Sequence, residues 1–220
     1  MINRRYDCVL YDFDGTLGDS IPLIIKCQQQ AYEEVMGNCP RSYDDLLSYI
    51  GLPLTETFSI HDKKTSEALL ESYLRINCYW LEHDGVPLFP GVSEELQRLK
   101  AAGIRQGIVT SKRKTSLDMS LKCLGLEDFF DVIVAKEDTK IHKPEAEPLL
   151  LASRILGIDT SRMIYVGDAV GDIKCAQNAG VAPVFVNWSI MPREEITALK
   201  PQYIINEMKE LSCIIFDGEL

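Results

Sequence analysis

From Pro90-Gly91 onward, the sequence alternates between helical and extended patterns, and this alternation constrains the fold more than any other feature. Short apolar runs are separated by segments whose apolar residues recur three and four positions apart. The pattern predicts helices over 93–102, 115–124, 147–156 and 172–179, and strands over 106–110, 131–135, 162–166 and 183–186. Alternating strands and helices are typical of a parallel sheet covered by helices, so we expect an α/β core.

The first strand of this core is expected near the N-terminus. Residues 8–11 form an apolar run that enters the polar cluster Asp12-Phe13-Asp14-Gly15-Thr16, as a buried strand ending in a loop would. Helical patterns follow at 20–36, 43–50 and 64–81, without a convincing strand between them. A last strand is expected at 203–205 and a last helix at 207–214. We therefore predict a Rossmann-like parallel-sheet core over 1–17 and 87–220, interrupted by a helical insert over 18–86.

Composition argues against several classes of partner. The formal net charge of −10 is not offset by any block rich in lysine and arginine, so no nucleic acid is expected. No window is apolar enough to span a bilayer and no signal-peptide pattern is seen, so we expect a cytoplasmic protein with no membrane partner. The seven cysteines contain no CxxC pair, which fits reduced thiols. The sequence leaves the oligomeric state open.

Polar residues gather where the predicted strands end. The first strand is followed by Asp12 and Asp14, the second by Thr110 and Ser111, the third by a segment that holds Lys143, and the fourth by Asp168 and Asp172. Ligand crevices of open α/β sheets lie beyond the carboxyl ends of the strands, so these side chains are expected to reach one crevice. Asp-x-Asp-Gly-Thr is the most specific pattern, because average residue usage gives a chance match in roughly one chain in a few hundred of this size.

At these positions the chain resembles the haloacid dehalogenase-like hydrolases, particularly their small phosphatases with a helical cap. The resemblance covers nearly the whole chain and rests on residues 12–17, 108–111, 143–144 and 166–172. It is greatest to the phosphoglycolate phosphatase and bacterial pyrophosphatase branch, notably at 51–56 and 109–112. It implies that residues 18–86 form an α-helical cap domain and that the chain is a phosphoric monoester hydrolase acting on a small phosphorylated metabolite.

The residues themselves suggest a mechanism. A carboxylate that attacks a phosphoryl group needs the charge of the phosphoryl oxygens neutralised, which Mg²⁺ can do. Mg²⁺ prefers hard oxygen ligands, and this preference suits Asp12, Asp168 and a carbonyl near Asp14, with Asp172 bound directly or through water. Asp12 is the expected nucleophile and would form an aspartyl-phosphate. Asp14 is expected to protonate the leaving oxygen and then to deprotonate the attacking water.

Further residues are expected to bind the substrate. Lys143, the Thr110 hydroxyl and the backbone N–H groups of Phe13 and Ser111 would hold phosphoryl oxygens. Gly15 and Thr16 belong to the same motif and are assigned to the substrate as well. In the insert, the loop at Gly51 and the nearby Arg41 are predicted to recognise the substrate. Gly18-Asp19 and Gly85-Val86 are predicted to act as the hinges of the insert.

Other functions were weighed on the same residues. A phosphomutase similar to β-phosphoglucomutase would keep every core residue, so the core does not separate it from a phosphatase. A dehalogenase of this family would lack the second aspartate, because it has no oxygen leaving group to protonate, and Asp14 counts against it. A non-catalytic binding module on the same fold would be expected to have lost the nucleophile or the metal carboxylates, all of which are present here.

Overall fold

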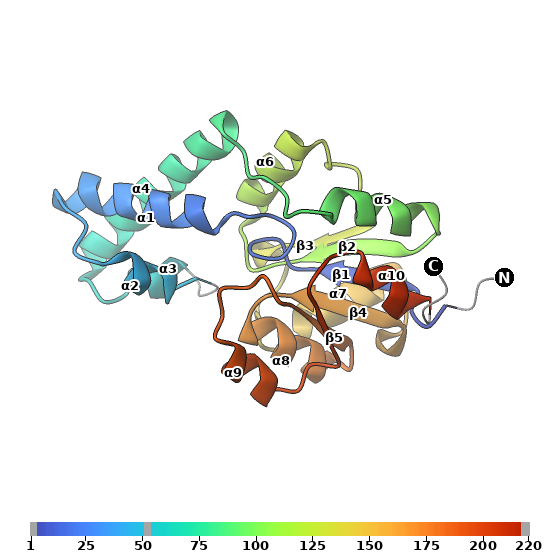
Figure 1. The fold of residues 1–220 in the computed structure, drawn as a ribbon. Coiled ribbons are helices and arrows are strands. Elements are labelled where there is room, and N and C mark those ends of the chain that lie inside the picture. The colour runs from blue at the N-terminus through green and yellow to red at the C-terminus, as the bar shows by residue number, and fades with distance from the viewer. Residues whose placement is uncertain (1–3, 51–53, 217–220) are drawn as a thin grey trace. The chain divides into compact units, whose positions relative to one another are not determined.

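The structure is a computed structural model that describes residues 4–50 and 54–216 (Figure 1). The chain forms two compact units. The first comprises Met1–Asp19, Leu88–Lys114 and Leu126–Leu220, and the second comprises Ser20–Pro87 and Thr115–Gly125.

The first unit is built on a six-stranded sheet in which every pairing is parallel. The strands are β1 (Cys8–Tyr11), β2 (Arg105–Val109), β3 (Val132–Val134), β4 (Met163–Gly167), β5 (Ala182–Val186) and β6 (Tyr203–Ile205). Their order is β3-β2-β1-β4-β5-β6, which places β1 at the centre, beside β2 and β4. Sheets of this order bind ligands where the strand order reverses, so a ligand site is expected at the carboxyl end of β1.

The two central strands are buried along their whole length. Every residue of β1 and of β4 is buried, as expected for parallel strands with helices on both faces of the sheet. The pairing runs from Cys8 opposite Met163 to Tyr11 opposite Val166. One residue further, the Asp12 N–H donates to the Val166 carbonyl oxygen at 2.9 Å. The register of β1 on β4 therefore fixes the backbone from which the first acidic loop departs.

Helices of the first unit cover this sheet. They are α5 (Val92–Ala101), α7 (Glu147–Leu156), α8 (Val170–Ala179), α9 (Arg193–Ala198) and α10 (Glu210–Ile215), with 3₁₀ turns at Lys136–Asp138 and Thr160–Arg162. Leu149 and Ala152 of α7 and Cys175 and Ala176 of α8 share one buried cluster with residues of β1 to β4. This packing anchors the helices that flank the carboxyl ends of β3 and β4.

The second unit is helical in its described part. It contains α1 (Ile21–Met36), α2 (Tyr43–Leu47), α3 (Leu54–Thr57), α4 (Lys63–His83) and most of α6 (Lys114–Leu124). Its core is separate, with Tyr32, Leu46, Phe58 and Leu69 among the residues buried in it. No helix of the described residues combines the length and the apolarity needed to cross a membrane.

The predicted α/β fold class is confirmed by the strand order and the parallel pairings. Each of the six predicted strands is found within one residue of its expected bounds. Two short helices, α3 and α9, and the 3₁₀ turns are not among the predicted elements. Thr115–Gly125 groups with the helices of the second unit, whereas the sequence pattern places it in the core. The assignment of 18–86 as a cap domain stays a prediction.

Candidate active site

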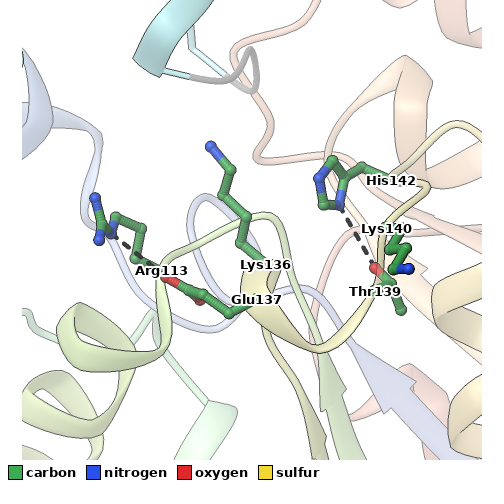
Figure 2. Close-up of a pocket in the computed structure, with 6 residues that line it drawn as sticks. All are labelled: Arg113, Lys136, Glu137, Thr139, Lys140 and His142. Carbon is green, nitrogen blue, oxygen red and sulfur yellow. Dashed lines mark hydrogen bonds and ion pairs between the residues drawn. The ribbon is translucent and has the colours of Figure 1, made fainter.

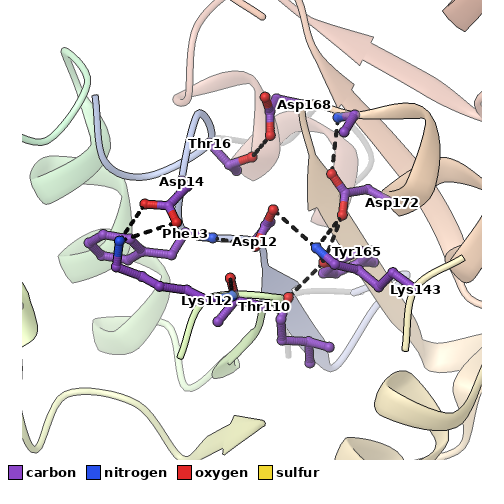
Figure 3. A network of polar contacts seen from close by, with 12 residues as sticks. Asp12, Phe13, Asp14, Thr16, Thr110, Lys112, Lys143, Tyr165, Asp168 and Asp172 are labelled. Carbon is purple, nitrogen blue, oxygen red and sulfur yellow. Dashed lines mark hydrogen bonds and ion pairs between the residues drawn. The ribbon is translucent and has the colours of Figure 1, made fainter. Parts of the chain in front are cut away.

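The loop after β1 carries two aspartates whose side chains make different contacts. One carboxylate oxygen of Asp12 accepts the Phe13 N–H at 2.8 Å, and the other lies 3.0 Å from Lys143 Nζ. Asp14 instead pairs with Lys112, whose Nζ lies 2.8 and 3.2 Å from its two carboxylate oxygens (Figure 3). The two aspartates of one motif are therefore held by two different lysines.

A glycine allows this loop to approach the fourth strand's acidic loop. Gly15 has φ = 79°, and a Cβ added there would lie 2.3 Å from a carboxylate oxygen of Asp168. Only glycine adopts this conformation readily and leaves that space free. The neighbouring Thr16 hydroxyl donates to Asp168 at 3.2 Å. Gly15 and Thr16, both assigned to the substrate from the sequence, thus contact Asp168 in the structure.

The loop after β4 supplies two more buried aspartates. Asp172 accepts the Ala169 N–H at 3.0 Å and contacts Lys143 Nζ at 2.6 Å. The backbone of Gly167 comes so close that a Cβ there would lie 2.4 Å from the Asp172 Cβ. Asp168 follows directly and is also buried. Close backbone packing therefore orients the Asp172 side chain.

Three of these carboxylates form one cluster. Ligand oxygens of Asp12, Asp168 and Asp172 all lie within 4.8 Å of one another, and all three residues are buried. Lys143 contacts two of the three carboxylates, so one ammonium faces three potential negative charges. Hard oxygen donors with excess negative charge are the ligand set that Mg²⁺ prefers. The Asp14 carboxylate lies outside this cluster, in its pair with Lys112.

Burial and the neighbouring charges shift the pKa values of the cluster's members. Burial raises the pKa of Asp12 to about 6, although the Lys143 ammonium opposes that rise. Burial, followed by repulsion from Asp172 and Asp12, raises the pKa of Asp168 well above its ordinary value. Burial would lower the pKa of Lys143, but the attraction of Asp12 and Asp172 outweighs it and raises this pKa. Without a cation, Asp12 and Asp168 would therefore release their protons at a higher pH than a free aspartate.

The loop after β2 supplies the hydroxyl predicted from the sequence. The Thr110 N–H donates to the Val134 carbonyl oxygen at 2.9 Å, which continues the ladder to β3. The Thr110 side chain is buried, and its hydrogen bond to Asp12 lowers the pKa of that carboxyl. Ser111, the next residue, is half-buried. Thr110 therefore lies against the proposed nucleophile.

Two residues of the network were given no role by sequence reasoning. Tyr165 lies inside β4, and its hydroxyl donates to the Val109 carbonyl oxygen at 2.7 Å and lies 3.1 Å from Asp172 and 3.2 Å from Lys143 Nζ. The apolar pattern of the β4 sequence does not indicate that the Tyr165 hydroxyl makes polar contacts. Lys112 carried a signal, since it stands two residues after Thr110 in the matched motif, but its partner Asp14 could not be read from spacing.

The two residues predicted in the insert belong to the second unit or lie outside the described residues. Arg41 stacks over the Tyr49 ring at 4.0 Å and donates to the Thr57 carbonyl oxygen at 3.4 Å. Its guanidinium is therefore engaged in contacts within that unit. Gly51 lies outside the described residues.

Comparison with known proteins decides the family. The family model for haloacid dehalogenase-like hydrolases matches residues 9–186, which include every carboxylate of the site. This chain belongs to that family. The resemblance seen in the motifs is thereby confirmed, and the α/β core with its buried aspartates is that of a haloacid dehalogenase-like hydrolase.

Related proteins cover almost the whole length of this hydrolase. Pyrophosphatase PpaX of Bacillus velezensis is 36% identical over 214 residues, which are 96% of this chain and 97% of the relative. A solved structure from Bacteroides fragilis described as a haloacid dehalogenase-like hydrolase is 31% identical, with a TM-score of 0.85 over 94% of this chain and 99% of the other. A predicted phosphoglycolate phosphatase of Haemophilus somnus shares the fold at 22% identity, with a TM-score of 0.86 over 96% and 98%.

Proposed function

We propose that this chain is a Mg²⁺-dependent phosphatase that hydrolyses a small phosphate ester, such as phosphoglycolate, or pyrophosphate through an aspartyl-phosphate on Asp12. One observation carries the proposal: Asp12 is buried with Lys143 Nζ at 3.0 Å and with Asp168 and Asp172 in the same cluster. Membership of a hydrolase family and relatives named pyrophosphatase support it. A non-catalytic module would be expected to have lost the nucleophile or a metal carboxylate, and Asp12, Asp168 and Asp172 are all present.

The carboxylate cluster fits the ion that the proposal requires. Three buried carboxylates with one ammonium between them are an unfavourable arrangement unless protons or a cation reduce their repulsion. Asp12, Asp168 and Asp172 are the residues that would hold Mg²⁺. The ion would offset the charge of the phosphoryl oxygens, so that a carboxylate can approach the phosphorus.

The first step would transfer the phosphoryl group to the protein. A carboxylate oxygen of Asp12 attacks phosphorus, forming an O–P bond as the bond to the leaving oxygen breaks. The Phe13 N–H and Lys143 orient the Asp12 carboxylate, because each lies within hydrogen-bond distance of one of its oxygens. The carboxyl group of Asp14, in its protonated form, gives its proton to the leaving oxygen and becomes a carboxylate.

The second step would release orthophosphate. A water oxygen bonds to phosphorus, the bond between phosphorus and Asp12 breaks, and Asp14 accepts the proton that the water loses. Lys112 pairs with both oxygens of Asp14 and so fixes this carboxyl group apart from the Asp12 cluster. The proposal therefore assigns the nucleophile and the acid–base group to two carboxyl groups that contact different lysines.

The decisive experiment is a phosphate-release assay on pyrophosphate, phosphoglycolate, sugar phosphates and p-nitrophenyl phosphate, with and without Mg²⁺. We expect Mg²⁺-dependent release from at least one substrate and its loss in Asp12→Asn, which keeps the size of the side chain but removes the nucleophile. Conversion of a sugar phosphate into its isomer without release of phosphate would identify a phosphomutase instead. Absence of turnover on every substrate would contradict the proposal.

Three further parts of the proposal concern the rest of the molecule. We place the enzyme in the cytoplasm, which the seven free cysteines support. Residues 18–86 would act as a cap domain that selects the substrate, with Arg41 and Gly51 in that role. Substitution of Arg41 by glutamine should then change the ranking of substrates rather than lower all rates equally.

A further inference from the structure

A cavity of about 440 Å³ opens on the first unit between the loops that follow β2 and β3 (Figure 2). Its lining residues are Arg113, Lys136, Glu137, Thr139, Lys140 and His142. None of them is part of the carboxylate cluster. The cavity is therefore a second polar site at the same edge of the sheet.

The lining is strongly cationic although the chain as a whole is acidic. The lining contains three cationic side chains, those of Arg113, Lys136 and Lys140, and a single carboxylate, that of Glu137, in a chain with a formal net charge of −10. Glu137 is already engaged, since one oxygen lies 3.4 Å from Arg113 Nε and the other accepts the Lys114 N–H at 2.8 Å. The cavity thus keeps an excess of positive charge.

Two lysines account for that excess. Within residues 4–50 and 54–216, no carboxylate lies at ion-pair distance from the ammonium of Lys136 or of Lys140. Lys136 is partly buried and projects between Arg113 and His142, whereas Lys140 is exposed (Figure 2). An ammonium that is partly removed from water without a counter-charge gains most when an anion binds beside it. The arrangement is that of an anion-binding pocket.

Two lining residues of the pocket are next to proposed catalytic-site lysines along the chain. Arg113 follows Lys112, which holds Asp14, and His142 precedes Lys143, which contacts Asp12. The Lys136 N–H donates to the Lys112 carbonyl oxygen at 3.1 Å, which joins the two loops. Arg113 and His142, one from each loop of the pocket, are thus chain neighbours of the lysines that contact Asp14 and Asp12.

We propose that this pocket binds a second anionic group of the substrate, on the side of the leaving oxygen. The preferred substrates would then be phosphate compounds whose leaving group itself carries a phosphate or a carboxylate. This inference rests on the proposed function, because it assigns the leaving side to Asp14. It adds that Lys136 and Lys140 select substrates by charge without taking part in the chemical steps.

The test compares substrates with charged and uncharged leaving groups. In Lys136→Gln and Lys140→Gln, KM for pyrophosphate or phosphoglycolate should rise roughly three- to tenfold, while kcat and the KM for p-nitrophenyl phosphate stay unchanged. A larger rise for pyrophosphate than for phosphoglycolate would assign the pocket to phosphate, and the reverse order to carboxylate. Lys174→Gln is the matched control, because Lys174 is an exposed lysine on α8 outside the cavity.

Two results would overturn the inference. One is an unchanged KM for the charged substrates in both variants, and the other is an equal loss on p-nitrophenyl phosphate. If no substrate is turned over, the proposed function fails, and the pocket is then tested by binding alone. Calorimetric titration of pyrophosphate into metal-free Asp12→Asn should show several-fold weaker binding once Lys136→Gln is added, and equal affinity would refute the pocket.

Discussion

At the scale of single residues, the hydroxyl of Tyr165 links the end of β2 to Lys143 and Asp172. It is buried in β4 and touches the Val109 carbonyl oxygen, Asp172 and Lys143 Nζ. A buried carbonyl that loses its donor keeps the cost of its desolvation. Tyr165 is therefore a positioning residue for Lys143 and Asp172 rather than a group that reaches the substrate.

Removal of this hydroxyl tests the positioning role. Tyr165→Phe keeps the packing but should destabilise the fold by about 1–2 kcal/mol, because the Val109 carbonyl oxygen loses its donor. We expect kcat to fall roughly three- to tenfold with little change in KM, since Lys143 loses an oxygen contact that orients it. Urea unfolding and steady-state kinetics measure the two effects. A loss of stability with unchanged kcat would limit Tyr165 to a structural role.

A pair of Asp→Asn substitutions should show opposite dependences of stability on pH. The pKa of Asp168 is raised, so its contribution to metal-free stability is complete below the ordinary value of 3.8 and is lost as pH rises towards the raised pKa. Asp168→Asn should therefore become more stable than the wild type as pH increases. The hydrogen bond from Arg162 lowers the pKa of Asp7 below its ordinary value of 3.8. The contribution of Asp7 to stability is therefore present above pH 3.8 and is lost as the pH falls through the lowered pKa.

Urea midpoints measured between pH 2 and pH 8 in the presence of a chelator check this pair. Asp7→Asn should cost more stability at pH 6 than at pH 2, whereas the gain from Asp168→Asn should grow over the same interval. If the stability of the two variants relative to the wild type changed with pH in the same direction, burial of Asp168 would not destabilise the metal-free fold. Such destabilisation is expected when carboxylates that bind a cation are buried without it.

At the scale of elements, the loop after β1 depends on the absence of a side chain at Gly15. Gly15 and Gly103 both have positive φ, at 79° and 74°. A Cβ added at Gly15 would collide with the Asp168 side chain, whereas a Cβ added at Gly103 would have no atom within 4 Å. Gly103→Ala should cost about 1 kcal/mol of backbone strain and leave kcat unchanged. Gly15→Ala should cause the same backbone strain and should also displace the Asp168 side chain, so we expect kcat to fall at least tenfold.

Thermal unfolding and phosphate release compare these two glycine variants directly. Equal losses of stability with equal activity would show that the loop yields without moving Asp168. A large loss of activity in Gly15→Ala alone would place the importance of this glycine in the approach of two loops rather than in the turn itself.

The strands were predictable because burial on both faces leaves a plain mark in the sequence. The apolar run Cys8–Tyr11 could be assigned without its neighbours, and Asp12 at its end followed from the general position of crevices in such sheets. The helix α9 was missed because Arg193–Ala198 is six residues long and buries only Ile196, which is too little for a periodic pattern. The grouping of Thr115–Gly125 with the second unit depends on contacts between distant segments, which no local pattern encodes.

At the scale of the whole molecule, the proposed cation site belongs to one of two units with separate cores. Asp12, Asp168 and Asp172 all lie in the first unit, whereas α1 and α4 contribute to the core of the second. A ligand that binds only the folded state stabilises the structure that supplies its contacts, by about 2.7 kcal/mol at a hundred times its Kd. Mg²⁺ alone should thus protect the first unit selectively.

Hydrogen–deuterium exchange resolves this selectivity along the chain. Saturating Mg²⁺ should slow amide exchange in β1, β4 and the start of α8, because their loops carry the three carboxylates, and should leave α1 and α4 unchanged. Asp168→Asn serves as the control, since loss of one ligand should remove most of the protection. Equal protection of α1 and α4 would contradict a site confined to the first unit, because an ion bound only there gives the second core no direct stabilisation.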